Sequence, residues 1–198
     1  MTPDASHFKL YEIRNFFDPE TCNQIVAELG RGELTAATVY GVGDSAAIDE
    51  RMRRAARVTP SVETFEAVNK QLLDRREEIS SQFGLELNSC EEPQFLRYRV
   101  GDFFVAHQDG NTGMMQSPRE QGRKISVVIF LNRQTENPAP GCYGGGDLVF
   151  TEWRPDRNCG QFHLAGEAGT LVAFPSETTH EVIPITHGER YSIVSWYG

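Results

Sequence analysis

The 198-residue sequence predicts a mainly β domain (α+β) of the sandwich or jelly-roll type, with helices in its N-terminal part. Three observations predict this. Apolar residues spaced three and four apart, the pattern of a helix face, occur before Gly84. After Gly84 the period changes to two, in short runs rich in β-branched and aromatic residues. Gly, Pro and Asn residues separate these runs, as is typical of short strands joined by turns.

The N-terminal third predicts a short strand and a first helix. Residues 8–17 alternate loosely and are interpreted as a strand. The Asp-Pro-Glu sequence at 18–20 predicts a helix start, because Asp is a favoured N-cap and Pro is favoured at the first helical position. Gly30 ends this helix after Leu29. Residues 35–58 are expected to be irregular, with one strand among them.

A second helix is predicted over residues 60–83. It is capped by Thr59-Pro60 or by Ser61, and Gly84 ends it. Its apolar face is interpreted as core packing and comprises Phe65, Val68, Leu72, Ile79 and Phe83. The strands predicted after it are 95–100, 103–107, 124–131, 147–151, 170–174, 180–185 and 190–197. Two long loops, 110–123 and 132–146, are expected to be functional because loops of that length are uncommon in a compact domain.

Composition limits the classes of partner. The net charge is −9 and the sequence pI is near 5.1, so a nucleic-acid partner is not expected. The arginine cluster of residues 51–57 is interpreted as a solvated face. Residues 1–10 carry no apolar run of signal-peptide length, and no stretch approaches the ~20 apolar residues of a membrane span. A cytoplasmic protein without a membrane partner is therefore expected.

The cysteines are interpreted as free thiols. Four are present, and no pair has the Cys-x-x-Cys spacing of a zinc or redox site. Cys142 and Cys159 flank a predicted hairpin, so a disulfide between them stays open at this point.

Three residues form a candidate metal site. In an extended segment, residues two apart point the same way, so His107 and Asp109 reach one point in space. His180 opens a strand much further along the chain. Two histidines and one carboxylate are the ligand set of non-haem Fe(II) oxygenases and leave coordination positions open. A structural zinc site would require a fourth protein ligand.

A candidate anion site lies on the last predicted strand. Arg190 and Ser192 share a face with Val194 and Trp196, and an inward-facing arginine in an apolar strand is costly unless it is paired. A carboxylate ligand would pair with Arg190 through two hydrogen bonds, and Ser192 would add another. An internal salt bridge is the alternative. Tyr98 is expected to point into the same core, either as a ligand contact or as a packed tyrosine.

The order of these segments resembles the catalytic domain of the prolyl-4-hydroxylase-like group in the Fe(II)/2-oxoglutarate-dependent oxygenase superfamily. The resemblance covers about residues 94–197. Its first half is carried by FLRYRVGDFFVAHQD, residues 95–109. Its middle is carried by SVVIFLN (126–132), GGDLVF (145–150) and GTLVAF (169–174). Its end is carried by HEV (180–182), followed ten residues after His180 by RYSIV (190–194).

The resemblance implies a double-stranded β-helix with helices packed on its larger sheet. It implies one domain over 1–198, in which residues 1–93 form a helical support region with outer strands and 94–198 form the Fe(II)/2-oxoglutarate core. It also implies that His107, Asp109 and His180 bind Fe(II), and that Arg190 binds 2-oxoglutarate with help from Tyr98 and Ser192. O₂ is the second co-substrate, and ascorbate is a candidate reductant. Succinate and CO₂ are released while a C–H bond is hydroxylated.

The substrate is predicted less sharply. A small molecule, a free amino acid or a peptide or protein side chain fits, and Arg97, Arg99, Asn111 and Trp153 are weak candidates for substrate contact. Many prolyl-4-hydroxylases carry Lys at the position of Arg190, which weakens prolyl specificity. Related halogenases lack a carboxylate such as Asp109, and AlkB-type demethylases carry a second Arg where Trp196 stands, so both subclasses are set aside. The alternatives are a cupin-like metal-binding protein or a metalloenzyme without 2-oxoglutarate.

Overall fold

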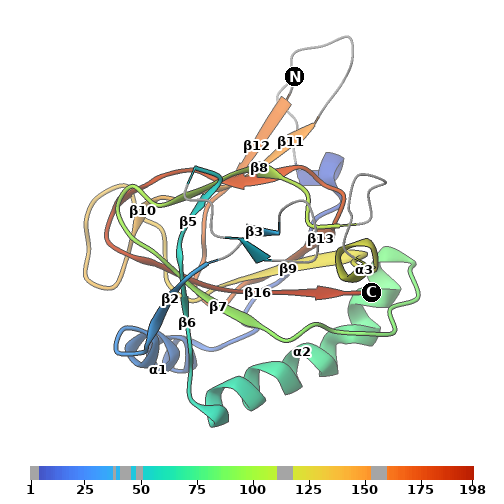
Figure 1. Ribbon diagram of the computed structural model, residues 1–198, viewed down its shortest axis with the longest axis horizontal. Helices are drawn as coiled ribbons and strands as arrows, with labels where there is room; N and C mark the ends of the chain where they lie inside the picture. The colour runs from blue at the N-terminus through green and yellow to red at the C-terminus, as the bar shows by residue number, and fades with distance from the viewer. Residues whose placement is uncertain (1–4, 38, 41–45, 48–50, 111–117, 153–159) are drawn as a thin grey trace.

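The protein is built from two antiparallel β-sheets that face each other, with helices on the outer face of the larger one (Figure 1). The computed structural model describes residues 5–37, 39–40, 46–47, 51–110, 118–152 and 160–198. No helix in these ranges is both long and apolar enough to cross a membrane.

The larger sheet has seven strands, and its centre is formed by the last strand of the chain. Its order is β1 (Tyr11–Ile13), β13 (Leu171–Pro175), β9 (Ile125–Phe130), β16 (Arg190–Tyr197), β7 (Gln94–Tyr98), β6 (Ala56–Val58) and β2 (Leu34–Ala36). The register places Arg190 opposite Tyr98 and Trp196 opposite Ser126. β16 lies in the middle of this sheet, between β9 and β7. Its side chains alternate between the two faces, and those on the face towards the smaller sheet lie in the core between the sheets.

The smaller sheet has five strands and carries the candidate metal ligands. Its order is β12 (Gly160–Leu164), β11 (Leu148–Glu152), β14 (His180–Val182), β8 (Phe103–His107) and β5 (Arg53–Arg54). Two short pairs complete the described strands: β10 (Gly144–Gly145) with β15 (Ile185–His187), and β3 (Val39–Tyr40) with β4 (Ala46–Ala47).

Two long helices cover the larger sheet, α1 (Pro19–Leu29) and α2 (Val62–Phe83). Asp18 caps α1 by accepting a hydrogen bond of 2.7 Å from the Thr21 N–H, and Ser61 caps α2 in the same way. Gly84 ends α2 with φ of 65°, a left-handed conformation that glycine adopts without strain. A short 3₁₀ helix (Ala5–Phe8) and a one-turn helix, α3 (Pro118–Gln121), are the remaining helical segments described.

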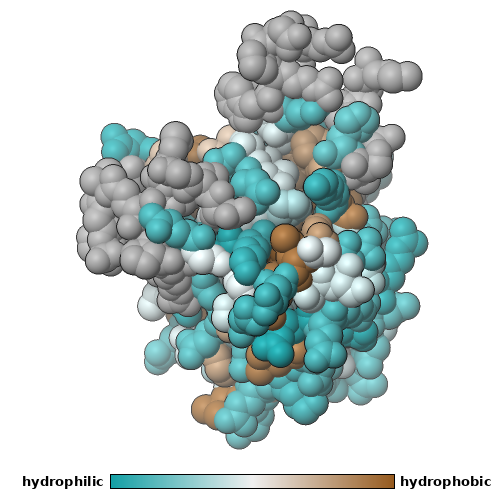
Figure 2. Space-filling model, turned by 90° about the vertical axis from the view of Figure 1, so that its right-hand side faces the viewer, coloured by the Kyte–Doolittle hydropathy of each residue, from teal (hydrophilic) through white to brown (hydrophobic). Residues whose placement is uncertain are grey.

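Each face of the larger sheet buries its own hydrophobic cluster. The outer cluster joins the helices to residues such as Phe95 and Ile193. The inner cluster lies between the two sheets and includes Tyr98, Phe130 and Phe150. On the outside, the face seen in Figure 2 is mainly hydrophilic over its described residues, with hydrophobic ones interspersed among them.

Leu72 is expected to carry much of the contact between α2 and the sheet. Its side chain is fully buried, whereas that of its neighbour Leu73 is 45% exposed. Leu72→Ala should lower the free energy of unfolding by about 2–5 kcal/mol, since the cavity left behind is not refilled. Leu73→Ala is the matched control and should change it by less than about 1 kcal/mol. Denaturant unfolding of both variants measures this, and equal effects would contradict the described packing.

The predicted helices are confirmed, and several strands differ from their predictions. The first strand covers three residues of the predicted 8–17, because a 3₁₀ helix occupies the start of that segment. The segment 35–58, expected to be irregular with one strand, contributes to five short strands, β2 to β6. The predicted strand 180–185 is divided into β14 and the start of β15, which join different sheets. Strand β12 was not predicted. Cys142 is a free thiol.

Candidate metal centre

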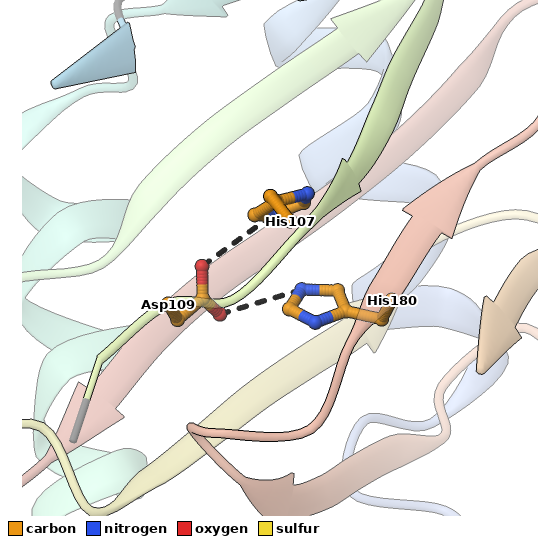
Figure 3. A group of neighbouring side chains, drawn as sticks. All are labelled: His107, Asp109 and His180. Carbon is orange, nitrogen blue, oxygen red and sulfur yellow. Dashed lines mark ion pairs between the residues drawn. The ribbon is translucent and has the colours of Figure 1, made fainter. Parts of the chain in front are cut away.

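His107, Asp109 and His180 lie together at one end of the smaller sheet (Figure 3). His107 is the last residue of β8 and His180 the first of β14, and the antiparallel register pairs them directly. Asp109 follows His107 by two residues. The sequence therefore brings two imidazoles together through strand pairing and adds the carboxylate through the period of two.

The distances place three metal-binding atoms around one point. His107 Nε2 lies 3.5 Å from Asp109 Oδ1, and His180 Nε2 lies 3.5 Å from Asp109 Oδ2. The exposed fractions of the three side chains are 16%, 13% and 5% in chain order, so the group is largely shielded from water. Within the described residues no further His, Cys, Asp or Glu joins this group.

Backbone carbonyls set the tautomer of both imidazoles. His107 Nδ1 lies 2.8 Å from the Val105 carbonyl oxygen, and His180 Nδ1 lies 2.9 Å from the Thr178 carbonyl oxygen. Because a carbonyl oxygen only accepts hydrogen bonds, each Nδ1 carries the proton. Nε2 of each ring is then the atom that faces Asp109 and that a metal would take, which is the arrangement that metal-binding histidines adopt.

The protonation states also suit a cation. Burial, and then the neighbouring His107, lower the pKa of His180 to about 4. Burial acts to raise the pKa of the Asp109 carboxyl, but His180, His107 and Trp196 together outweigh it and hold that pKa well below its usual range. At neutral pH His180 is neutral and Asp109 is ionised, so these two donors are already deprotonated as metal binding requires.

Aromatic rings form the wall around the two histidines. The Phe104 ring stacks on His107 with centroids 3.6 Å apart, and the Phe174 ring meets the edge of His180 at 4.8 Å. This apolar wall restricts water around the donors, which strengthens their attraction for a cation. Two nitrogen donors and one oxygen donor without a fourth described ligand fit an ion such as Fe(II), with positions left open for other ligands.

Arg190 is a buried cation in the same core between the two sheets. Its side chain is 1% exposed, and its guanidinium carbon lies 5.1 Å from the Tyr98 ring centre and 5.2 Å from that of Phe130. Its Nε has no hydrogen-bond partner, and among the described residues no carboxylate lies within ion-pair distance. A buried charge without a counter-ion is strongly unfavourable, so this position is suited to an anionic ligand.

Two hydroxyl groups accompany Arg190. Ser192 and Tyr143 are each fully buried, and neither hydroxyl oxygen has a hydrogen-bond partner in the described part of the chain. Burial raises the pKa of the Tyr143 phenol, although Arg190 opposes this, so the phenol is protonated and can donate. These two hydroxyls and the Arg190 Nε–H are three hydrogen-bond donors without a described partner, and Arg190 supplies the positive charge among them.

Tyr143 was not predicted from the sequence. It lies in the 132–146 loop, and the length of that loop is the signal that could have drawn attention to it. Glycines make room for this arrangement. A Cβ at Gly146, whose φ is 67°, would lie 3.3 Å from Arg190 Cδ, and a Cβ at Gly166 would lie 2.0 Å from the Tyr143 hydroxyl.

The structure describes two of the four predicted substrate residues, Arg97 and Arg99. Arg97 and Tyr98 are adjacent on β7, so their side chains lie on opposite faces of the sheet. Arg97 Nε lies 3.7 Å from Glu189 Oε1. Arg99 lies 3.4 Å from the same oxygen and is 61% exposed. Their placement gives no support to substrate contact, which stays a prediction. Asn111 and Trp153 lie outside the described residues.

Facing antiparallel sheets with two histidines and a carboxylate between them define the class of non-haem iron oxygenases. Comparison with known families agrees. The model of the 2OG-Fe(II) oxygenase superfamily matches residues 93–198, more than half of the chain. The chain belongs to this superfamily, which implies Fe(II) as the metal and 2-oxoglutarate and O₂ as co-substrates.

Curated relatives and solved structures are similar over nearly the whole chain. A PKHD-type hydroxylase of Shewanella sp. strain MR-4 is 29% identical over 194 residues, which covers 94% of this chain and 77% of the relative. A prolyl-4-hydroxylase of Pseudomonas putida aligns with a TM-score of 0.64 and 22% identity over 98% of this chain and 94% of its own. A prolyl hydroxylase of Trichoplax adhaerens, solved with a peptide fragment of hypoxia inducible factor, aligns with a TM-score of 0.67 and 18% identity over 97% and 84% of the two chains. These neighbours confirm the predicted double-stranded β-helix.

Proposed function

We propose that this protein is an Fe(II)- and 2-oxoglutarate-dependent hydroxylase in which Arg190 binds the distal carboxylate of 2-oxoglutarate. The observation that carries the proposal is the buried Arg190 without a described counter-ion, with the unused Tyr143 and Ser192 hydroxyls, in the same inter-sheet core as the three metal donors. A cupin-like metal site has no need of such an anion pocket.

Each residue has a distinct role in this proposal. His107, Asp109 and His180 hold the metal, and the metal with 2-oxoglutarate and O₂ supplies the oxidising chemistry. Arg190 fixes the far end of 2-oxoglutarate and so directs its keto acid end towards the triad. The Tyr98 ring contacts the Arg190 guanidinium and limits its movement. Phe104 and Phe174 exclude water around the donors.

The proposed reaction is hydroxylation of an unactivated C–H bond in a small molecule, a free amino acid or a peptide or protein side chain, with release of succinate and CO₂. Two similar structures are described as prolyl hydroxylases, one of them with a peptide bound. These descriptions support a peptide among the substrates to be screened. Screening would follow succinate formation above the rate without substrate.

Equilibrium binding tests the co-substrate assignment. The protein is loaded with Mn(II), which occupies the site without turnover, and is titrated with 2-oxoglutarate in a calorimeter. We expect saturable binding that depends on the metal, and much weaker binding of succinate, which lacks the keto group. Metal binding without any binding of 2-oxoglutarate would contradict the proposal and favour the cupin-like alternative.

Tyr143→Phe should raise the dissociation constant of 2-oxoglutarate by about 3- to 10-fold, as expected for one lost hydrogen bond to a ligand. Stability of the protein without ligand should be unchanged, because the Tyr143 hydroxyl has no described partner to lose. The same titration measures the first effect and thermal unfolding the second.

Tyr191→Phe is the matched control. Tyr191 lies on the opposite face of the larger sheet, and its hydroxyl donates to Glu189 Oε2 at 2.7 Å. This variant should leave 2-oxoglutarate binding unchanged. If Tyr143→Phe binds 2-oxoglutarate as tightly as Tyr191→Phe does, the Tyr143 hydroxyl takes no part in the pocket.

A further inference from the structure

A second group of buried side chains lies next to Asp109. Its centre is Trp196, which is 7% exposed and lies on the inward face of β16. The guanidinium carbon of Arg123 lies 3.8 Å from the Trp196 ring centre, a close cation–π contact. This contact fixes the plane of the indole against a charged partner.

Arg123 is itself held by two hydrogen bonds to one carboxylate. Its Nε donates to Glu91 Oε1 at 2.6 Å and its Nη2 donates to Glu91 Oε2 at 3.0 Å. The two side chains are 5% and 14% exposed, so this is a shielded pair with defined geometry. The third nitrogen of Arg123 reaches the metal centre, because Nη1 donates to the Asp109 carbonyl oxygen at 3.2 Å.

The backbone on both sides of Asp109 is also anchored. The Asp109 N–H donates to the Ser176 carbonyl oxygen at 2.9 Å, and the Gly110 N–H donates to the same oxygen at 3.2 Å. The Asp109 N–H is therefore bonded to Ser176, and the Asp109 carbonyl oxygen accepts the hydrogen bond from Arg123. The carboxylate is the remaining part of Asp109 that must be oriented.

One donor in this group is unused. The Trp196 Nε1–H is buried, and it has no hydrogen-bond partner among the described residues. Arg123 contacts both the Trp196 ring and the Asp109 carbonyl oxygen, so the indole lies next to Asp109. A buried N–H that stays without an acceptor is costly, so an acceptor is expected there.

We propose that Trp196 is a positioning residue for the metal: its indole N–H binds the Asp109 oxygen that the metal does not take, and the Arg123–Glu91 pair holds the indole in place. This proposal rests on the proposed metal-binding function of the triad. A hydrogen bond to the second oxygen satisfies the buried N–H and favours one orientation of the carboxylate, as outer partners of metal ligands do.

Metal titration tests this without any turnover. Co(II) replaces Fe(II) as a visible probe, and its absorption gives both the dissociation constant and the ligand geometry. Trp196→Phe keeps an aromatic ring for Arg123 but removes the N–H. We expect the dissociation constant of Co(II) to rise about 10-fold or more, the range found when a partner of a metal ligand is lost, with a changed Co(II) spectrum.

A second variant and a control separate the N–H from packing. Trp196 replaced by benzothienylalanine keeps the bicyclic ring and exchanges N–H for sulfur, so it should weaken Co(II) binding as much as Trp196→Phe does. Tyr197→Phe is the control: the adjacent residue on β16 loses a 2.7 Å hydrogen bond from its hydroxyl to the Leu72 carbonyl oxygen, on the helix side of the sheet. It should bind Co(II) as the unmodified protein does.

Co(II) affinity and spectrum unchanged in both Trp196 variants would overturn the positioning role, while tight Co(II) and 2-oxoglutarate binding by the unmodified protein would still support the proposed function. If only Trp196→Phe weakened binding, ring size and not the N–H would be responsible, and the proposal would again be wrong. An unmodified protein that binds no Co(II) would overturn both.

Discussion

Replacing His180 with alanine is expected to abolish iron-dependent turnover and to weaken metal binding by more than about 100-fold. Loss of a residue that only supports a ligand costs about 10- to 100-fold in metal affinity, and loss of the ligand itself should exceed that. His180 supplies one of the two nitrogen donors, and its Nδ1 is committed to the Thr178 carbonyl oxygen. The remaining His107 and Asp109 offer two donors, too few to hold the ion firmly.

Succinate formation and Co(II) titration measure this effect. The fold should survive, because the described hydrogen bond of the His180 ring is a single bond to Thr178, and thermal unfolding checks this. His163→Ala is the matched control: His163 lies on β12 of the same sheet, is 50% exposed and pairs with Asp147. Unreduced turnover in folded His180→Ala would rule out this triad as the metal site.

Replacing Arg190 with methionine is expected to raise the dissociation constant of 2-oxoglutarate by about 30-fold or more. Truncating one member of a buried, hydrogen-bonded charge pair costs about 2–5 kcal/mol, and each 1.4 kcal/mol is tenfold in affinity. Methionine fills a similar volume and removes the charge, so the loss reports on the carboxylate contact. Metal affinity should stay unchanged, since Arg190 is not a member of the triad.

The same variant distinguishes an anion pocket from a structural salt bridge. An arginine that stabilises the fold through an internal acid costs about 3–5 kcal/mol when its partner is left unpaired. Arg190 is 1% exposed and has no described carboxylate partner, so Arg190→Met should leave the ligand-free protein as stable as before or more stable. Strong destabilisation, with unchanged 2-oxoglutarate binding, would assign Arg190 to the fold.

The features that the sequence predicted are those set by local chemistry. Asp18 and Gly84 mark helix ends because capping depends on the residue itself and on its own backbone. His107 and Asp109 were paired because the period of a strand places residues two apart on one side. His180 was added because it completes a known ligand set and Arg190 because an inward-facing arginine needs a partner, and the order of segments that resembles the family supported both. The structure brings His180 to His107.

The features that the sequence did not predict depend on contacts between distant segments. Tyr143 reaches Arg190 from a loop whose path is set by β10 pairing with β15, a pairing that no local pattern indicates. Residues 35–58 form strands two or three residues long, too short for a period to appear, because neighbouring strands supply their hydrogen bonds. Trp196 fits any buried strand position, and only the contact of Arg123 with both the Trp196 ring and Asp109 gives it a further role.

The central claim is that the three donors and Arg190 together bind a metal and 2-oxoglutarate. It is tested most directly by adding Fe(II) and then 2-oxoglutarate to the metal-free protein without oxygen, and recording the visible spectrum. We predict a weak metal-to-ligand charge-transfer band that appears only when both are present and is absent in Asp109→Ala. Iron binding without that band would contradict chelation of 2-oxoglutarate at this site.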